Sequence, residues 1–165
     1  MQNNSIEELF HLAIALERAA ESFYRGLAAK FESLPEVVVF WRKYEREEGG
    51  HARFLEELLG RLSPEKKCQP ASIELIASAR RLLYPSPEAL LAGITNLEEA
   101  YQGAFEIEHN ETNLIFETLI TDFAVTSQAV TFLKRQLREH ADGLSREFPP
   151  PYDSAVVRRT VKAGS

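Results

Sequence analysis

The chain has 165 residues, is 44% hydrophobic and carries a formal net charge of -6 at pH 7. These values predict one domain with a substantial core, and the negative charge argues against a nucleic-acid partner. The lone Cys68 excludes an internal disulfide framework and a CxxC metal knuckle. With no apolar run of about 18 residues and no signal-peptide pattern, we expect a cytoplasmic protein without a membrane segment.

Two long helices are expected in the first half of the chain. The first runs from about Ser5 to Phe31, and Ser5 with Glu8 three residues later forms a capping-box pattern. "ESLPE" at 32–36 ends it, and the second helix is expected from about Glu36 to Leu62. A long connection follows, in which "IELIASARRLLY" at 73–84 predicts one short helix.

Two more long helices are expected in the second half. The third begins at Ser86, with Pro87 in its first turn, and reaches about Asp122; the fourth runs from the turn at 124–128 to about Phe148. Two helical hairpins joined by a long crossover predict an all-α, antiparallel four-helix bundle over residues 1–148. Residues 149–165 are expected to form a poorly ordered tail.

Each long helix interrupts its apolar seam with side chains that could bind a metal. In the second helix, steps of four and then three back from Leu55 reach His51 and Glu48. The other long helices show similar interruptions. A buried carboxylate alone costs several kcal/mol, so such groups are paired or bind a metal. The candidate ligands are Glu17, Glu48, His51, Glu108, Glu111 and His140.

Position along the bundle supports this grouping. Glu17 is about as far before the first turn as His51 is after it. Glu111 is about as far before the second turn as His140 is after it, and Glu108 is expected one turn deeper. Glu98 is set aside because it is far from that turn and lies about 80° off the seam at 100° per residue.

These residues resemble the rubrerythrin branch of the ferritin-like family, over nearly the whole chain through about residue 148. The resemblance depends on Glu17 with Tyr24 seven residues later, Glu48-x-x-His51, Glu108-x-x-Glu111 and His140. It implies a ferritin-like bundle with a di-iron centre and a catalytic Tyr24 near the metal. The implied roles are terminal ligands Glu17 and His51, bridging ligands Glu48 and Glu108, a terminal or switching ligand Glu111, and His140 on the second metal.

The resemblance also implies an activity. The protein would be a non-haem di-iron peroxidase or oxidoreductase that reduces peroxide or dioxygen under oxidative stress. Two iron ions are expected, with a single ion, or manganese or zinc, as alternatives. The chain lacks the four cysteines of a rubredoxin-like domain, so we expect an external redox protein as electron donor. A homodimer is expected.

Two positions depart from the family pattern. Leu137 stands where a glutamate is expected one turn before His140, and its neighbours Gln136 and Glu139 are expected to point elsewhere. Ile115 replaces a second tyrosine. The departures keep an alternative open: a degenerate ferritin-like binding module with one metal or none, acting in metal handling, sensing or protein interaction.

A glycine pair, Gly49 and Gly50, lies between Glu48 and His51 in the second helix. Each glycine is unfavourable by about 1 kcal/mol relative to alanine in a helix interior. Missing side chains would let a neighbouring helix or a partner subunit approach closely. The alternative is a simple kink.

Overall fold

A computed structural model describes residues 4–110 and 112–155 of the chain. The described residues are helical without a strand, which confirms the predicted all-α, ferritin-like fold class. In chain order the elements are α1 (Ile6–Lys30), α2 (Pro35–Arg61), α3 (Pro64–Lys67), α4 (Ile73–Leu82), α5 (Pro87–Ala92), α6 (Leu97–Glu108), α7 (Thr112–Phe123), α8 (Ser127–Arg146) and the 3₁₀ helix η1 (Pro150–Ala155). None of the described helices is long and apolar enough to cross a membrane.

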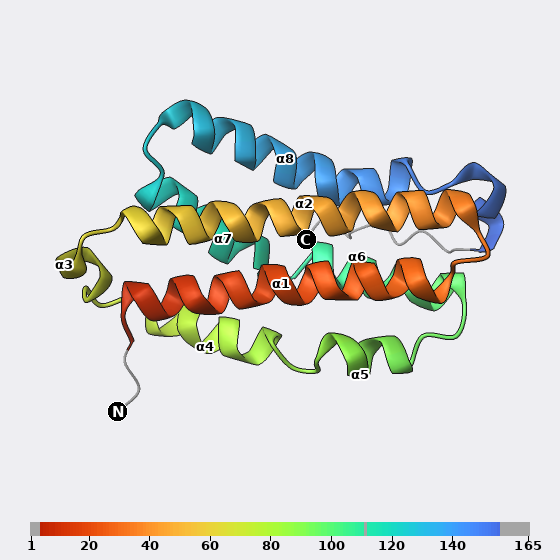
Figure 1. The fold of residues 1–165 in the computed structure, drawn as a ribbon, viewed down its shortest axis with the longest axis horizontal. Coiled ribbons are helices and arrows are strands. Elements are labelled where there is room, and N and C mark those ends of the chain that lie inside the picture. Colours follow the sequence, from red (N-terminus) through yellow and green to blue (C-terminus); the bar gives the residue numbers. More distant parts are fainter. Residues whose placement is uncertain (1–3, 111, 156–165) are drawn as a thin grey trace, which may run out of the picture.

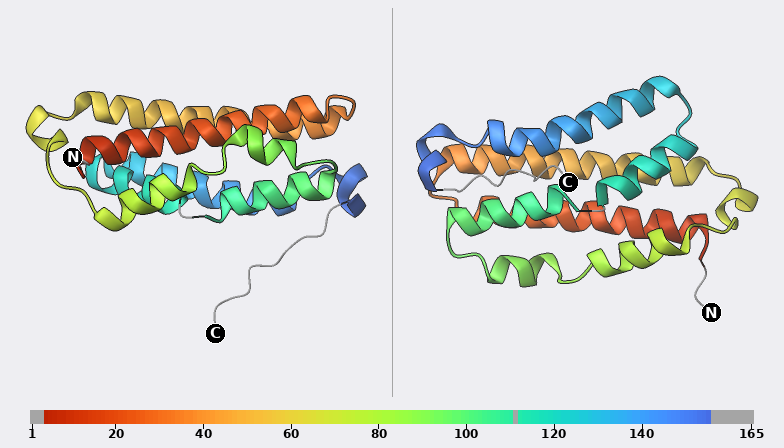
Figure 2. Two further views of the ribbon diagram at one scale, coloured as in Figure 1. Left: turned by 90° about the horizontal axis from the view of Figure 1, so that it is seen from below. Right: turned by 180° about the vertical axis from the view of Figure 1, so that it is seen from behind.

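The helices form a bundle in which α1 and α2 make one long antiparallel hairpin (Figure 1). The crossover α4–α5 returns along α1, so that α6 starts at the end of the bundle where α2 starts. Helices α6 and α7 then follow one another along the bundle, and α8 runs back beside them (Figure 2). The four rods of the bundle are therefore α1, α2, the pair α6–α7, and α8.

The expected third long helix is wrong as one continuous element, because the chain leaves the helix twice between Ser86 and Asp122. Ser86 does cap a helix, but α5 ends at Ala92. Asn96 then caps α6 by accepting a hydrogen bond from Glu99 N at 2.9 Å. Between α6 and α7, Asn110 accepts a hydrogen bond from Thr112 N at 2.7 Å. Such caps compete with helix continuation, and the apolar periodicity alone did not reveal them.

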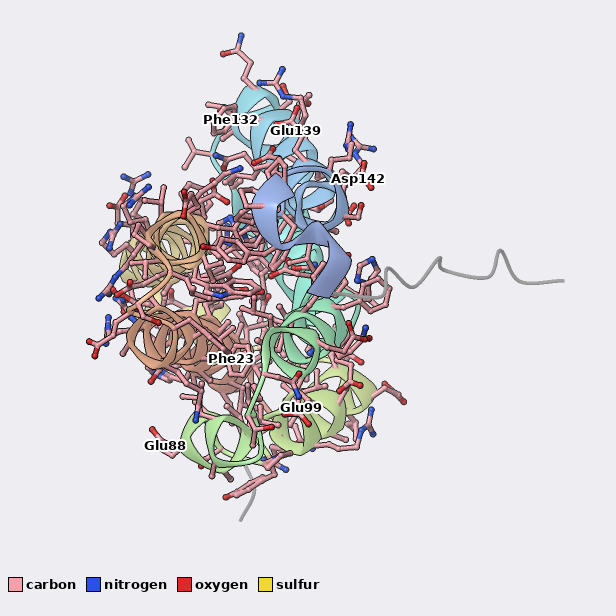
Figure 3. The ribbon with its side chains drawn as sticks, turned by 90° about the vertical axis from the view of Figure 1, so that its right-hand side faces the viewer. Phe23, Glu88, Glu99, Phe132, Glu139 and Asp142 are labelled. Atoms are coloured by element: carbon pink, nitrogen blue, oxygen red, sulfur yellow. The ribbon has the colours of Figure 1, made fainter. Side chains whose placement is uncertain are left out.

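The core consists of two apolar clusters at different heights in the bundle. The first, called the aromatic cluster below, is rich in aromatic side chains and includes Phe23, Trp41, Tyr101 and Phe148, whereas the second is largely aliphatic. Figure 3 looks along the bundle and shows Phe23 reaching inward, with charged side chains such as Asp142 at the rim. Separate apolar clusters leave a level between them where buried polar groups gather.

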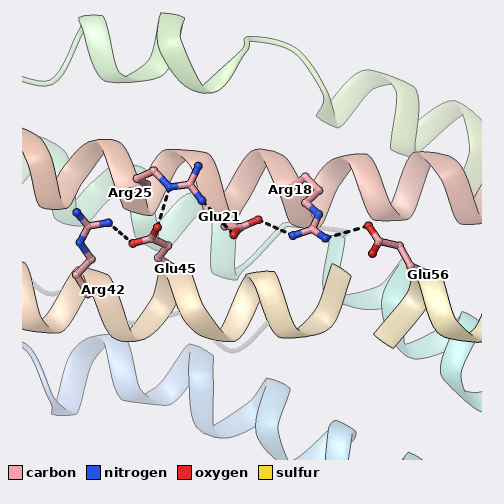
Figure 4. Close-up of polar contacts among 6 residues, drawn as sticks. All are labelled: Arg18, Glu21, Arg25, Arg42, Glu45 and Glu56. Carbon is pink, nitrogen blue, oxygen red and sulfur yellow. Dashed lines mark hydrogen bonds and ion pairs between the residues drawn. The ribbon is translucent and has the colours of Figure 1, made fainter. Parts of the chain in front are cut away.

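A ladder of ion pairs joins the outer faces of α1 and α2 (Figure 4). Arginines and glutamates alternate along it, with donor–acceptor distances of 2.6 to 3.1 Å. Exposed pairs contribute only about 0–1 kcal/mol each, so the ladder adds little to the stability of the hairpin. Its members are Arg42, Glu45, Arg25, Glu21, Arg18 and Glu56.

The ladder explains one of the two glycines. A Cβ at Gly49 would lie 2.9 Å from Glu21 Oε1, so the missing side chain makes room for a glutamate of the neighbouring helix. At Gly50 the nearest atom is Arg53 Nη2 at 3.9 Å, so that position is open. Helix α2 continues through both residues. Close approach by a neighbouring helix, one of the two expectations, therefore accounts for Gly49.

The end of the chain beyond α8 is described as far as residue 155. Phe148 is buried in the aromatic cluster, and Tyr152 of η1 packs against that cluster. The remainder of the expected tail, residues 156–165, lies outside the described residues. The described part of the segment therefore covers one end of the bundle.

Candidate metal centre

Five of the six candidate ligands lie together between the two apolar clusters. They come from four helices, and each is at most 5% exposed. The seam spacing accounts for this burial, because residues three or four apart share one helix face. The five are Glu17 on α1, Glu48 and His51 on α2, Glu108 on α6, and His140 on α8. The sixth, Glu111, lies outside the described residues.

The first group consists of Glu17, Glu48 and His51. His51 Nδ1 lies 3.4 Å from Glu17 Oε2 and 3.4 Å from Glu48 Oε2. One ligand atom from each residue lies within 4.8 Å of the others, a spacing at which three side chains could hold one ion.

The second group consists of Glu48, Glu108 and His140. His140 Nδ1 lies 3.1 Å from Glu48 Oε1 and 3.1 Å from Glu108 Oε2. Glu48 belongs to both groups and directs a different oxygen to each histidine, and the two imidazole centroids are 6.1 Å apart. This is the arrangement that a carboxylate bridging two adjacent cations requires.

Several polar atoms of the two groups make no hydrogen bond within the described part of the chain. They are Glu17 Oε1, His51 Nδ1, Glu108 Oε2 and His140 Nε2, all buried. Buried polar atoms nearly always have partners. A cation in each group would supply a partner to the first three, whereas His140 Nε2 faces Glu47 Oε2 at 2.8 Å. Mixed carboxylate and imidazole donors suit iron, manganese or zinc. The residues present therefore fit a pair of transition-metal ions.

The groups hold protons that metal ions would displace. Burial by itself would lower the pKa of His51, but the carboxylates of Glu17 and Glu48 outweigh it and raise that pKa to about 10. Burial and the Glu17 carboxylate raise the pKa of Glu48 to about 8. At Glu108, burial by itself would raise the pKa, but the neighbouring His140 outweighs it and lowers the pKa. Because ligands bind metals in their deprotonated forms, metal binding must release protons here.

Tyr24, predicted from the sequence to lie near the metal, is one hydrogen bond away from a candidate ligand. Its hydroxyl donates to Glu108 Oε1, and its ring stacks on Trp41 with centroids 5.9 Å apart. Burial and the Glu108 charge raise the pKa of Tyr24 well above its usual value. The hydroxyl therefore keeps its proton and acts as a donor.

Sequence reasoning missed two residues of α2 that face His140. The Tyr44 ring stacks on the His140 ring with centroids 4.2 Å apart, and the Tyr44 hydroxyl donates to the His140 carbonyl at 3.1 Å. Glu47 Oε2 lies 2.8 Å from His140 Nε2. A step of four back from His51 reaches Glu47, so the seam spacing could have revealed it.

A polar cavity of about 120 Å³ lies beside the two histidines. Gln136 and Glu139, which flank Leu137 in sequence, line this cavity, and Glu139 belongs to neither metal group. Leu137 belongs instead to the aliphatic cluster. Since a water occupies about 30 Å³ in the liquid, the cavity has room for a small oxidant. The full lining is Lys43, Glu47, His51, Gln136, Glu139, His140 and Glu147.

Comparison with known proteins identifies one family. A family model described as Rubrerythrin matches residues 8–134. No curated protein matches the chain, and no solved structure does. The matched span runs from α1 into α8 and contains Glu17, Glu48, His51 and Glu108, whereas His140 follows it.

Proposed function

Because the chain belongs to the rubrerythrin family, we propose that it binds two iron ions and reduces hydrogen peroxide or dioxygen with electrons from an external donor. The observation that carries the proposal is Glu48, whose two oxygens face two different buried histidines. One ion would be held by Glu17, Glu48 and His51, and the other by Glu48, Glu108 and His140. When bound, a ferrous pair supplies the two electrons that, with two protons, convert one peroxide to two waters.

The chain itself supplies access, shielding and a hydrogen-bond donor. The cavity beside His51 and His140 gives a small oxidant a path to the histidines. The apolar clusters on both sides exclude bulk water, which strengthens electrostatic interactions inside the site. Tyr24 holds a proton on its hydroxyl oxygen and orients Glu108 through its hydrogen bond.

Electrons would have to come from another protein. A rubredoxin iron site needs four cysteine thiolates, and this chain has one cysteine, Cys68, which is exposed. We therefore propose a small redox protein as the donor.

Peroxide consumption by iron-loaded protein, with a reduced small redox protein as donor, tests the proposal. The controls are apo-protein and a His51→Ala variant, and the iron content per chain is measured in each sample. The iron-loaded protein should be faster than both controls. If iron is bound but peroxide consumption equals that of the apo-protein, the enzyme proposal fails. The metal then serves a binding or sensing role, as in the degenerate-module alternative.

A further inference from the structure

Glu47 stands apart from the candidate ligands, although it neighbours one of them in sequence. Its side chain leaves α2 toward α8 and borders the cavity, and it is 34% exposed where the ligands are buried. Glu47 Oε2 lies 2.8 Å from His140 Nε2, on the opposite edge of the ring from Glu48 and Glu108. Glu47 therefore contacts a candidate ligand without belonging to either metal group.

The two ring nitrogens of His140 have separate surroundings. Nδ1 faces the carboxylates of Glu48 and Glu108, so it is the nitrogen placed to bind a metal. A neutral imidazole that binds a metal through Nδ1 carries its proton on Nε2. A carboxylate that accepts this proton's hydrogen bond fixes the tautomer, orients the ring and makes the other nitrogen a better donor.

We propose that Glu47 is a positioning residue that holds the His140 ring with its proton on Nε2 and the Nδ1 lone pair toward the metal group shared with Glu48 and Glu108. This inference rests on the proposed metal-binding function. Tyr44 completes the support, since its stacked ring and its hydrogen bond to the His140 carbonyl restrain the same residue.

The two histidines differ in this support. Within the residues that the structure describes, His51 contacts carboxylates only through Nδ1. The Phe116 ring packs against the His51 ring, with ring centroids 4.9 Å apart. His140 contacts carboxylates through both nitrogens. Leu137, in place of the expected glutamate, lies in the aliphatic cluster. Glu47 therefore strengthens the position from which the α8 carboxylate is missing.

The experiment isolates the His140 group in a His51→Ala background and titrates it with Co²⁺ alone, followed by visible absorption. Glu47→Ala removes the acceptor, and Glu47→Gln keeps a neutral acceptor of similar shape. The matched control is Glu139→Ala, which removes an equal charge from the same cavity. Among residues 4–110 and 112–155, the only ion pair of Glu139 is an exposed one with Arg135, with Nε and Oε1 3.6 Å apart. Circular dichroism of each apo-variant checks that the helices are retained.

We expect Glu47→Ala to raise the Co²⁺ dissociation constant by about 10- to 100-fold. Glu47→Gln should raise it less, and Glu139→Ala should stay within about threefold, because an exposed charge acts weakly through screened solvent. A second readout is the His140 Nε2–H signal in ¹⁵N NMR of the Zn²⁺-loaded protein. It should be protected from solvent exchange in the parent and in Glu47→Gln, and exchange-broadened in Glu47→Ala.

Two results overturn the inference in different ways. If Glu47→Ala weakens Co²⁺ binding no more than Glu139→Ala does, and the Nε2–H signal stays protected, Glu47 does not position His140 while the metal site stands. If the wild-type protein binds no Co²⁺, the proposed metal function fails as well. If Glu47→Ala loses its helices, the Co²⁺ dissociation constants of Glu47→Gln and the parent are compared instead. An unchanged constant in Glu47→Gln then overturns the inference.

Discussion

Glu48 lies between the two histidines, so its replacement by glutamine tests whether it bridges two ions. The variant keeps the shape of the side chain and removes the ionisable carboxyl group whose Oε1 faces His140 and whose Oε2 faces His51. Glu17→Gln changes the His51 group only, and Glu108→Gln changes the His140 group only. A bridge therefore predicts that one substitution weakens both binding steps, whereas each control weakens one.

The size of the effect follows from the number of oxygens involved. Losing a direct carboxylate ligand should weaken each ion by about tenfold or more, because even groups that only support a ligand change affinity by 10- to 100-fold. Two affected ions give about 100-fold or more overall, or about 2.8 kcal/mol. Each single-group control should reach about tenfold on one ion, or about 1.4 kcal/mol.

The apo-protein should tolerate Glu48→Gln. Since the pKa of Glu48 is raised to about 8, this carboxyl group is mostly neutral at pH 7 in the folded protein, as glutamine is. In the unfolded parent Glu48 ionises near its ordinary value of about 4.5, so the parent loses stability as the pH rises from about 4.5 to about 8, whereas the glutamine variant has no such loss. The apo-variant should therefore be the more stable protein at pH 7, and its advantage should stop growing above about pH 8.

The assay combines Co²⁺ titration by calorimetry, resolved into two steps, with urea unfolding of the apo-proteins. The expected result is two weakened steps for Glu48→Gln and one for each control. One weakened step, as in Glu17→Gln, would show that Glu48 binds a single ion. Two unchanged steps in a folded variant would refute the assignment of Glu48 as a ligand.

Three further predictions concern other parts of the structure. Gly50→Ala should raise the free energy of unfolding by about 0.5–1 kcal/mol. Gly49→Ala should raise the free energy of unfolding by less, or lower it, because its Cβ would lie 2.9 Å from Glu21 Oε1. Urea unfolding of both variants measures the difference. The apo-protein should lose stability as pH rises from about 6.5 to about 10, because the raised pKa of His51 makes the folded state bind more protons than the unfolded state there, and denaturant unfolding at pH 6, 8 and 9.5 checks the sign. Tyr24→Phe should destabilise the apo-protein by about 1–3 kcal/mol, because it leaves a buried carboxylate oxygen without its donor, and it should slow peroxide consumption per bound iron.

The four amphipathic segments and the polar positions on their seams could be predicted from the sequence. Hydrophobic periodicity is a local property, so it places Glu17, Glu48, His51, Glu108 and His140 on the inward faces of their helices without knowledge of the neighbours. Counting residues from the turns also matched Glu17 with His51, because antiparallel helices of equal rise bring equally distant residues face to face. The same counting matched His140 with Glu111 and put Glu108 one turn deeper, whereas in the structure Glu108 lies beside His140.

The helix breaks and the contacts between helices could be seen only in the tertiary structure. The breaks on either side of α6 depend on capping hydrogen bonds to Asn96 and Asn110, which compete with the apolar pattern that suggested one continuous helix. Which oxygen of Glu48 faces which histidine, and the approach of Glu47 to His140, are distances between helices. Such distances depend on how the helices pack against one another, and the pattern within a single helix contains no information about them.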